Sequence, residues 1–174
     1  MLDVGEIQTI DHDVLIIGAG GAARGVLAPL LTLEPSETVI ANRTPERARS
    51  LAAACEKLGV VTAVGLEHIC AGTFDLVINA TAASLSGDIP AVPATVLGPE
   101  TVCYDMAYGK SDTAFVRWAR KHGCTRAVQG WGMLVEQAAE SFRIWRGVRP
   151  PTAAVLAALR QHQRNVTSSS AMVG

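Results

Sequence analysis

The sequence contains no apolar run near the ~20 residues that a membrane-spanning helix needs. Its formal net charge is −1, and no block of basic residues indicates nucleic acid or an anionic membrane surface as a partner. The first residues combine neither a basic start nor a long apolar core, so they do not resemble a secretory signal. These absences predict a soluble, cytoplasmic protein with neither a membrane nor a nucleic acid as its partner.

Cysteine is also scarce. The four cysteines, Cys55, Cys70, Cys103 and Cys124, form no C-x-x-C pair, and most of them stand among apolar neighbours. We therefore expect buried free thiols in a reducing compartment rather than disulfides, and we assign no metal ligand.

Apolar residues, by contrast, make up 49% of the 174 residues, which is ample for one buried core. Short apolar runs alternate with segments of helical periodicity. We expect strands over residues 14–17, 38–42, 60–64, 74–81, 100–108 and 125–130. We expect helices after the glycines that follow residue 17, and over 45–59, 112–123, 131–147 and 151–163. Pro29 should kink the first helix or remove one of its hydrogen bonds.

This alternation predicts an α/β fold: a doubly wound parallel sheet with helices on both faces. We divide the chain into an N-terminal extension (1–13), one α/β domain (14–162) and a tail (163–174). The tail is small and polar, and we expect it to be disordered.

A glycine-rich turn follows the first expected strand, where Gly18, Gly20 and Ala23 form G-x-G-x-x-A. In this motif the first glycine permits a tight turn, the second lets a pyrophosphate approach the backbone, and the third position keeps the helix close to the strand. The start of the helix adds free N–H groups and a partial positive charge. Glycine-rich turns also simply reverse a chain, but the strand, helix and second strand around this one favour a Rossmann-like dinucleotide-binding domain.

The second expected strand ends at Asn42, followed by Arg43, Thr44 and Arg47. An NAD-binding domain usually has an acidic residue here, which binds the ribose hydroxyls. Arginine instead favours the 2′-phosphate of NADP, which it can bind in a forked geometry, and Thr44 adds a hydroxyl donor. The pattern predicts NADP(H) as the cofactor. The alternative interpretation is two solvated surface arginines.

Two later expected strands also have candidate ligand-binding residues at their carboxyl ends, the edge where open α/β sheets bind ligands. Asn79 and Thr81 suit a cofactor ribose or phosphate, or are turn residues. Met106 offers a soft apolar surface to a nicotinamide, although most methionines belong to a core. Gln137, by its pattern alone, is an ordinary exposed helix residue.

Several segments together resemble the shikimate dehydrogenase family, over the C-terminal, NADP-binding half from about Val14 to Leu159. They are "GAGGAARG", "NRT" with Arg47, "FDLVINAT", "SGDIP", "CYDMAY" and "GMLVEQAAESFRIWRGVRP". The early segments are also similar to glutamyl-tRNA reductase, and the later ones favour shikimate dehydrogenase. The resemblance implies an oxidoreductase of the shikimate pathway of aromatic amino acid biosynthesis, converting 3-dehydroshikimate and NADPH to shikimate and NADP⁺.

The resemblance also implies roles for individual residues. The NADP phosphates would be held by Gly18, Ala19, Gly20, Gly21, Ala22, Asn42, Arg43, Thr44 and Arg47. Met106 and Gly130 would lie on the nicotinamide side, and Tyr108 and Gln137 would reach the substrate. The chain departs from the family pattern at residues 82–84, where the family commonly has serines and a glycine, and at Gln129, where it often has Asp.

The larger departure concerns the family's N-terminal domain, which binds most of the substrate and supplies a lysine–aspartate pair for proton transfer. Only 13 residues precede the first strand here, and they contain no lysine. Lys57, Lys110 and Lys121 occupy no position that marks an acid–base residue, so we assign no catalytic residue. We expect little or no turnover from this chain alone, and self-association through the exposed cleft face. The alternatives are a non-catalytic NADP-binding module and a quinate/shikimate enzyme of broader range.

Overall fold

Six parallel strands form the centre of the structure, a computed structural model that describes residues 12–159 and residue 161. They are β1 (Asp13–Ile17), β2 (Glu37–Asn42), β3 (Thr62–Gly65), β4 (Phe74–Asn79), β5 (Leu97–Asp105) and β6 (Arg126–Gln129). Their order in the sheet is β3-β2-β1-β4-β5-β6, and every neighbouring pair is parallel. The chain therefore runs outward from β1 in both directions, which is the predicted doubly wound topology.

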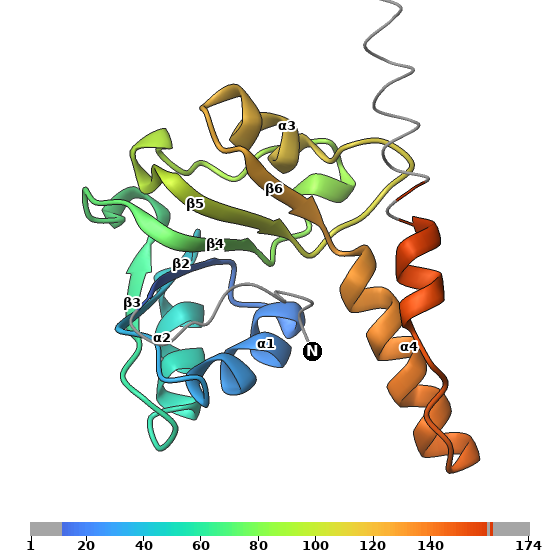
Figure 1. Ribbon diagram of the computed structural model, residues 1–174. Helices are drawn as coiled ribbons and strands as arrows, with labels where there is room; N and C mark the ends of the chain where they lie inside the picture. Colours follow the sequence, from blue (N-terminus) through green and yellow to red (C-terminus); the bar gives the residue numbers. More distant parts are fainter. Residues whose placement is uncertain (1–11, 160, 162–174) are drawn as a thin grey trace, which may run out of the picture.

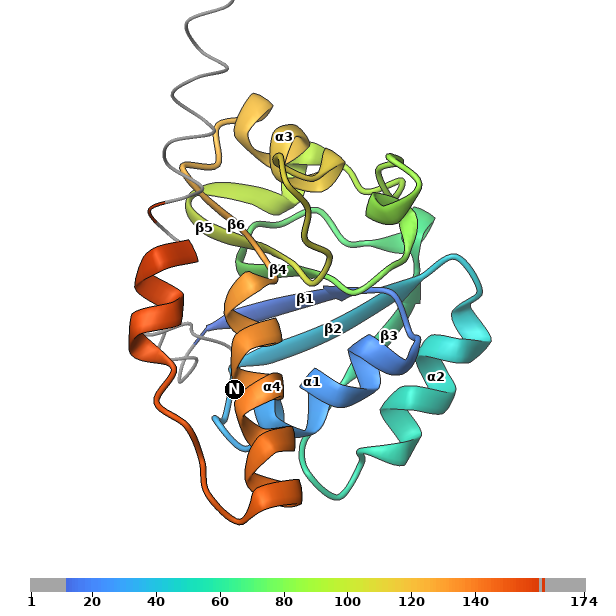
Figure 2. The same cartoon turned by 90° about the vertical axis from the view of Figure 1, so that its right-hand side faces the viewer.

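Helices cover both faces of this sheet (Figures 1 and 2). On one face lie α1 (Gly21–Leu31) and α2 (Pro45–Ala54), and on the other lies α3 (Ala114–Lys121). Successive side chains of a strand point to opposite faces, so Val14 and Ile16 pack with α1 and α2 while Leu15 and Ile17 pack with α3. All four are fully buried, which explains why β1 is a continuous apolar run rather than an alternating one.

The first helix contains the proline noted in the sequence, and the second ends earlier than expected. α1 continues through Pro29 and ends two residues later at Leu31; the Thr32 hydroxyl then donates to the Pro29 carbonyl at 2.7 Å. α2 ends at Ala54 and not at residue 59, because the chain turns at the buried Cys55, where the Leu58 N–H donates to the Cys55 carbonyl at 2.8 Å.

Several strand boundaries also shift. β3 begins at Thr62 and leaves Val60 91% exposed, because this edge strand pairs only with β2 and its first partner is Val39. β4 and β5 end at Asn79 and Asp105, so the residues expected to extend them form loops. The sequence patterns did not predict three short 3₁₀ turns, at Leu66–His68, Ala83–Leu85 and Ala94–Val96.

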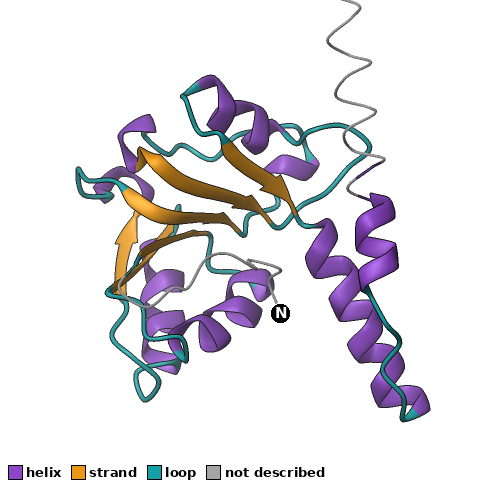
Figure 3. Ribbon diagram, in the orientation of Figure 1, coloured by secondary structure: helices purple, strands orange, loops and turns teal. Residues whose placement is uncertain are grey.

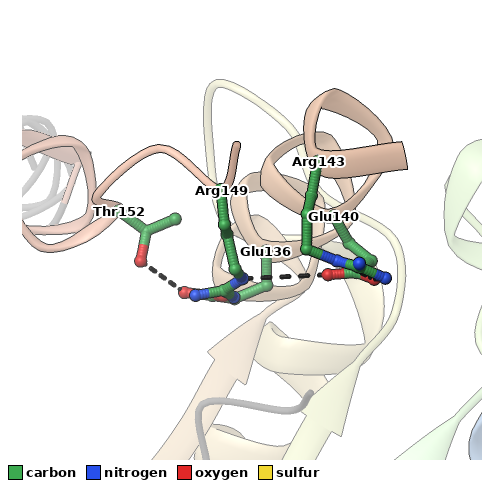
Figure 4. A network of polar contacts seen from close by, with 5 residues as sticks. All are labelled: Glu136, Glu140, Arg143, Arg149 and Thr152. Carbon is green, nitrogen blue, oxygen red and sulfur yellow. Dashed lines mark hydrogen bonds and ion pairs between the residues drawn. The ribbon is translucent and has the colours of Figure 1, made fainter. Parts of the chain in front are cut away.

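The last long helix, α4 (Trp131–Arg146), extends away from the sheet (Figure 3). Ala139 is its one buried residue, and a helical segment over 153–159 returns beside it. The returning chain is held by a polar network (Figure 4): Glu136 accepts hydrogen bonds from Thr152, at 2.7 Å, and from Arg149. Glu140 pairs with Arg143 at 2.5 Å in the same network. Most of the expected extension, 1–13, and the expected tail lie outside the described residues.

Three of the cysteines, Cys55, Cys103 and Cys124, are buried as expected, but Cys70 is exposed because it lies in the loop that leads into β4. A hydrogen bond with Cys124, together with burial, raises the pKa of the Cys103 thiol. No helix in the described part of the chain is both long and apolar enough to cross a bilayer.

Candidate functional site

A cleft of about 660 Å³ opens at the carboxyl ends of the central strands. Parallel strands with helices on both faces leave a crevice here, where the chain order reverses between β1 and β4. The cleft is lined by Gly18, Asn42, Arg43, Leu66, Glu67, Thr81, Ala82, Ala83, Ser86, Asp88, Ile89, Pro90 and Ala91. The glycine turn, the end of β2 and the loop after β4 therefore meet at one place.

The glycine turn has the conformation that the motif predicts. Gly18 has φ +106°, and its N–H donates to the Ala41 carbonyl at 2.8 Å. Any other residue at this position would have to adopt an unfavourable backbone conformation, and its Cβ would lie 3.0 Å from the Ala80 carbonyl oxygen. By contrast, a Cβ at Gly20 or Gly21 would meet no atom within 4 Å, so the space in front of the turn is open.

The start of α1 faces this open space with unused donors. Gly20 is the N-cap, no side chain caps the helix, and its first turn contains no acidic residue. The first helical hydrogen bond runs from the Arg24 N–H to the Gly20 carbonyl at 3.0 Å, which leaves the preceding N–H groups available to a ligand. Together with the helix dipole, they favour an anionic group such as a pyrophosphate.

The end of β2 adds positive charge. The Asn42 side chain donates to the Thr44 carbonyl at 2.8 Å and so shapes the turn into α2, while Thr44 makes no side-chain capping bond. Arg43 lines the cleft, and neither it nor Arg47 forms an ion pair with any described residue. Arg49, on the same helix as Arg47, is instead bound to Glu46 at 3.0 Å. Both guanidinium groups are exposed; Arg43 is at the cleft, and Arg47, which is not among the lining residues, lies four residues further along on α2.

Two acidic residues of the cleft escaped the sequence analysis. Glu67 follows β3 and is bound to His68 at 3.0 Å, and Asp88 accepts a hydrogen bond from Ser86 at 2.9 Å. Glu67 stands in a short 3₁₀ turn outside any recognised motif, and Asp88 lies in the "SGDIP" segment but had no assigned role, so only the folded chain shows that both line the same cleft as Arg43. The described residues contain no cluster of three or more potential metal ligands.

The polar residues at the end of β4 divide between the cleft and the interior. Thr81 lines the cleft, but Asn79 is fully buried and its amide is engaged internally. The Asn79 Oδ1 accepts from the Thr81 hydroxyl at 2.7 Å, and its Nδ2 donates to Asp105 and to Ser84, each at 3.1 Å. The side chain of Asn79 therefore supports the wall of the cleft from behind instead of facing a ligand.

The residues that the family resemblance assigns to the nicotinamide and the substrate lie after β5 and β6, and none of them is among the residues that line the cleft. Met106 is only 9% exposed and packs in the core, while Tyr108 is 41% exposed and its ring lies 4.8 Å from that of Trp131. Gly130 approaches the chain closely, since a Cβ there would lie 2.5 Å from the Met106 carbonyl oxygen. Gln137 is exposed on α4, about 9 Å along the helix axis from Trp131.

The departure at Gln129 has a structural explanation. Its side-chain oxygen accepts a hydrogen bond from the Gly109 N–H at 2.8 Å, which fastens the loop after β5 to the end of β6. The same loop is held by the Gly130 N–H, which donates to the Ala107 carbonyl at 3.1 Å. The backbone that carries Tyr108 is thus anchored at both ends.

The sheet order, the glycine turn and the uncapped helix behind it define a dinucleotide-binding domain of the Rossmann type. Residues 4–86 match the family model described as shikimate / quinate 5-dehydrogenase, and residues 130–160 match that of the shikimate 5'-dehydrogenase C-terminal domain. The chain belongs to the shikimate dehydrogenase family.

Individual relatives agree with this assignment. Shikimate dehydrogenase (NADP(+)) of Alkalilimnicola ehrlichii is 58% identical over 147 residues, which are 84% of this chain and 54% of that protein. Among solved structures, an Ael1 enzyme from Pseudomonas putida is 46% identical with a TM-score of 0.80, over 91% of this chain and 58% of that one. Quinate dehydrogenase from Corynebacterium glutamicum in complex with NAD is 25% identical with a TM-score of 0.73, over 87% and 55% of the two chains. The chain thus spans about half the length of the curated relatives that it matches.

Proposed function

We propose that this chain is the NADP(H)-binding part of a shikimate dehydrogenase, which reduces 3-dehydroshikimate to shikimate with NADPH. The observation that carries the proposal is Arg43, which lines the cleft just after β2 and forms no ion pair with an acidic residue in the described part of the chain. Together with the open glycine turn, it provides an anion site at each place where NADP carries phosphate. The curated relatives named as NADP(+) enzymes support the same cofactor.

The residues present fit this cofactor. The pyrophosphate would bind the free N–H groups at Gly20, Gly21 and Ala22, where the space is open. The 2′-phosphate would bind Arg43, with Arg47 one helical turn further along, because an arginine fork matches phosphate oxygens. Glu67 and Asp88 also line the cleft, but the Glu67 carboxylate lies 3.0 Å from Nδ1 of His68, and the Asp88 carboxylate accepts a hydrogen bond from Ser86.

When bound, NADPH supplies the hydride that reduces a carbonyl group. At the nicotinamide end of the cofactor, the chain itself would contribute the shape of the site. A side chain at position 130 would collide with the Met106 carbonyl, so Gly130 allows the strand ends to stay close. Tyr108, whose ring packs against Trp131, is exposed and would offer its hydroxyl to the substrate, and Gln137 would offer an amide further along α4.

The family resemblance implies a lysine–aspartate pair for proton transfer, and no lysine of the described residues lines the cleft. Lys57 follows the end of α2, Lys121 is the last residue of α3, and Lys110 is an exposed loop residue. We therefore expect the acid–base pair to come from a substrate-binding part, corresponding to the half of the relatives that this chain does not match. Alone, the chain should turn over shikimate slowly or not at all.

The surface of α4 suits contact with that second part. Four apolar side chains on or just after this helix are largely exposed: Phe142 (45%), Ile144 (68%), Trp145 (79%) and Val148 (65%). Apolar surface gathered in this way is typical of an interface. Without its partner the chain should self-associate, through this face together with the cleft. Light scattering across a concentration series checks this, and a Trp145→Glu variant should be monomeric where the unaltered chain is not.

The first test of the proposed function is direct titration of the purified chain with NADP⁺ and with NAD⁺. NADP⁺ should bind more tightly, and equal or tighter binding of NAD⁺ would remove the basis of the proposal. In the same preparation, NADP⁺ and shikimate should produce little reduced-nicotinamide absorbance. Rapid turnover would mean that one domain, or a dimer of it, builds a complete site.

Two other functions make different predictions. A quinate/shikimate enzyme of broader range is favoured by the description of the matched family, which names both substrates. Turnover of quinate by this chain reconstituted with a substrate-binding partner would support it. A non-catalytic NADP-binding module would bind the cofactor yet gain no activity from any such partner.

A further inference from the structure

A single carboxylate, Asp105, lies fully buried at the end of β5. Its Oδ2 accepts hydrogen bonds from the Thr113 hydroxyl at 2.5 Å and the Ser84 hydroxyl at 2.6 Å. Its Oδ1 accepts from the Asn79 amide and from the Ala107 N–H, each at 3.1 Å. It forms no ion pair with any described residue, so these four hydrogen bonds are what satisfies its buried oxygens.

One branch of this network reaches the wall of the cleft. Ser84 donates to Asp105 and accepts from Asn79, whose Oδ1 in turn accepts from the Thr81 N–H at 3.1 Å and hydroxyl at 2.7 Å. The Thr81 hydroxyl then accepts from the Ala83 N–H at 3.3 Å. Thr81 and Ala83 both line the cleft, so an unbroken series of hydrogen bonds connects its surface to the buried carboxylate.

The other branch reaches the loop after β5. The Ala107 N–H that binds Asp105 is followed directly by Tyr108, and the Ala107 carbonyl accepts from the Gly130 N–H at 3.1 Å. The register of the sheet places Asn79 opposite Asp105, which is why one carboxylate can bind both loops. The wall of the cofactor cleft and the loop that carries Tyr108 thus share a single anchor.

We propose that Asp105 is a positioning residue that holds these two loops in the shape that receives the cofactor, before the cofactor binds. The inference rests on the proposed NADP(H) function and adds to it a residue that never touches the ligand. Loops that are already ordered lose little conformational freedom on binding, so the anchor should strengthen affinity without any direct contact.

The test compares three variants by titration with NADP⁺. Asp105→Asn replaces an acceptor oxygen by a donor amide, and Ser84→Ala removes one donor and leaves the carboxylate in place. Thr101→Val is the matched control, because Thr101 is only 3% exposed and its hydroxyl donates to the Phe74 carbonyl at 2.6 Å. It links the same two strands, β4 and β5, at the end away from the cleft.

We expect Asp105→Asn to weaken NADP⁺ binding about tenfold and Ser84→Ala severalfold, at a temperature where circular dichroism shows each variant folded. Thr101→Val should lose thermal stability yet bind NADP⁺ like the unaltered chain. If Thr101→Val weakens binding as much as the other two, or if neither of those weakens it, the positioning role is refuted. Ser84→Ala keeps the test decisive if Asp105→Asn does not fold.

Hydrogen exchange without cofactor separates this inference from the proposed function. Ser84→Ala and Asp105→Asn should speed the exchange of amides over 81–86 and 106–109, whereas Thr101→Val should leave both segments unchanged. If exchange is faster in these two variants but the unaltered chain binds no NADP⁺, the positioning role of Asp105 stands and the proposed cofactor is rejected. If exchange in both segments is unchanged in the two variants, the positioning role of Asp105 is rejected even if the chain binds NADP⁺.

Discussion

Replacing Arg43 by alanine should separate NADP⁺ from NAD⁺ binding. Arg43 lines the cleft and has no ion pair with a described residue, so its removal breaks no contact that the folded chain shows. The two cofactors differ only in the 2′-phosphate, which carries about −1.5 to −2 charge at neutral pH, as other phosphate monoesters do. Any loss that affects NADP⁺ alone must therefore arise at this phosphate.

The size of the effect follows from the exposure of the arginine. Two unit charges 4 Å apart attract by about 1 kcal/mol in water and by about 4 kcal/mol at the effective dielectric near a protein surface. Arg43 is exposed but stands at the edge of a cleft, which places it between these values. We expect a loss of about 1.5–3 kcal/mol, or roughly 10- to 100-fold in the dissociation constant for NADP⁺. Affinity for NAD⁺ should not change.

Isothermal titration with both cofactors measures this difference. Arg49→Ala is the matched control, because Arg49 is an exposed arginine on α2 that is already bound to Glu46. It should leave both affinities unaltered. An equal loss for NADP⁺ and NAD⁺ in Arg43→Ala, or no loss for either, would show that Arg43 does not bind the 2′-phosphate.

Three further substitutions test other parts of the structure. Gly20→Ala should leave stability within about 0.5 kcal/mol, because its Cβ meets no atom within 4 Å, yet weaken NADP⁺ binding in the same titration by filling space meant for the pyrophosphate. Gly130→Ala should cost about 1–3 kcal/mol in a denaturant titration, because its Cβ would lie 2.5 Å from the Met106 carbonyl oxygen; an unchanged midpoint would contradict this. The hydrogen bond from Thr152, and then Arg149, lower the pKa of Glu136 below its ordinary 4.5. The folded state therefore gains stability from the ionised Glu136, fully above pH 4.5, and loses it as the pH falls through the lowered pKa. Glu136→Gln should accordingly destabilise the chain at neutral pH and much less in acid.

Much of the fold could be predicted because its signals are local. The apolar run of β1, the glycine turn and the Pro45 at the start of α2 each depend on a few consecutive residues. The ends of elements were less predictable, because they depend on neighbours. β3 begins where β2 offers a partner, and β5 ends at Asp105 because the carboxylate turns back to bind the loop that follows.

The site residues divide in the same way. Gly18 and Arg43 were identified by type and position, and both line the cleft. Asn79 was identified by its place at the carboxyl end of a strand, and it is the last residue of β4, but the sequence carried no sign that its side chain would bind Asp105 and Ser84 in the interior. The network that fastens α4 to the chain after it, through Glu136 and Arg149, likewise had no signal in the sequence.

The sequence by itself determined the kind of domain and the sign of the charge at the end of β2, since a turn, a helix start and a charged side chain are properties of short segments. Only the tertiary structure decided how the cleft is held. Asp105 is 26 residues from Asn79 and 21 from Ser84, and these groups meet only because β4 and β5 pair in parallel register. Hydrogen bonds act over about 3 Å, whereas sequence patterns carry no such distances, so this buried anchor exists only in the folded chain.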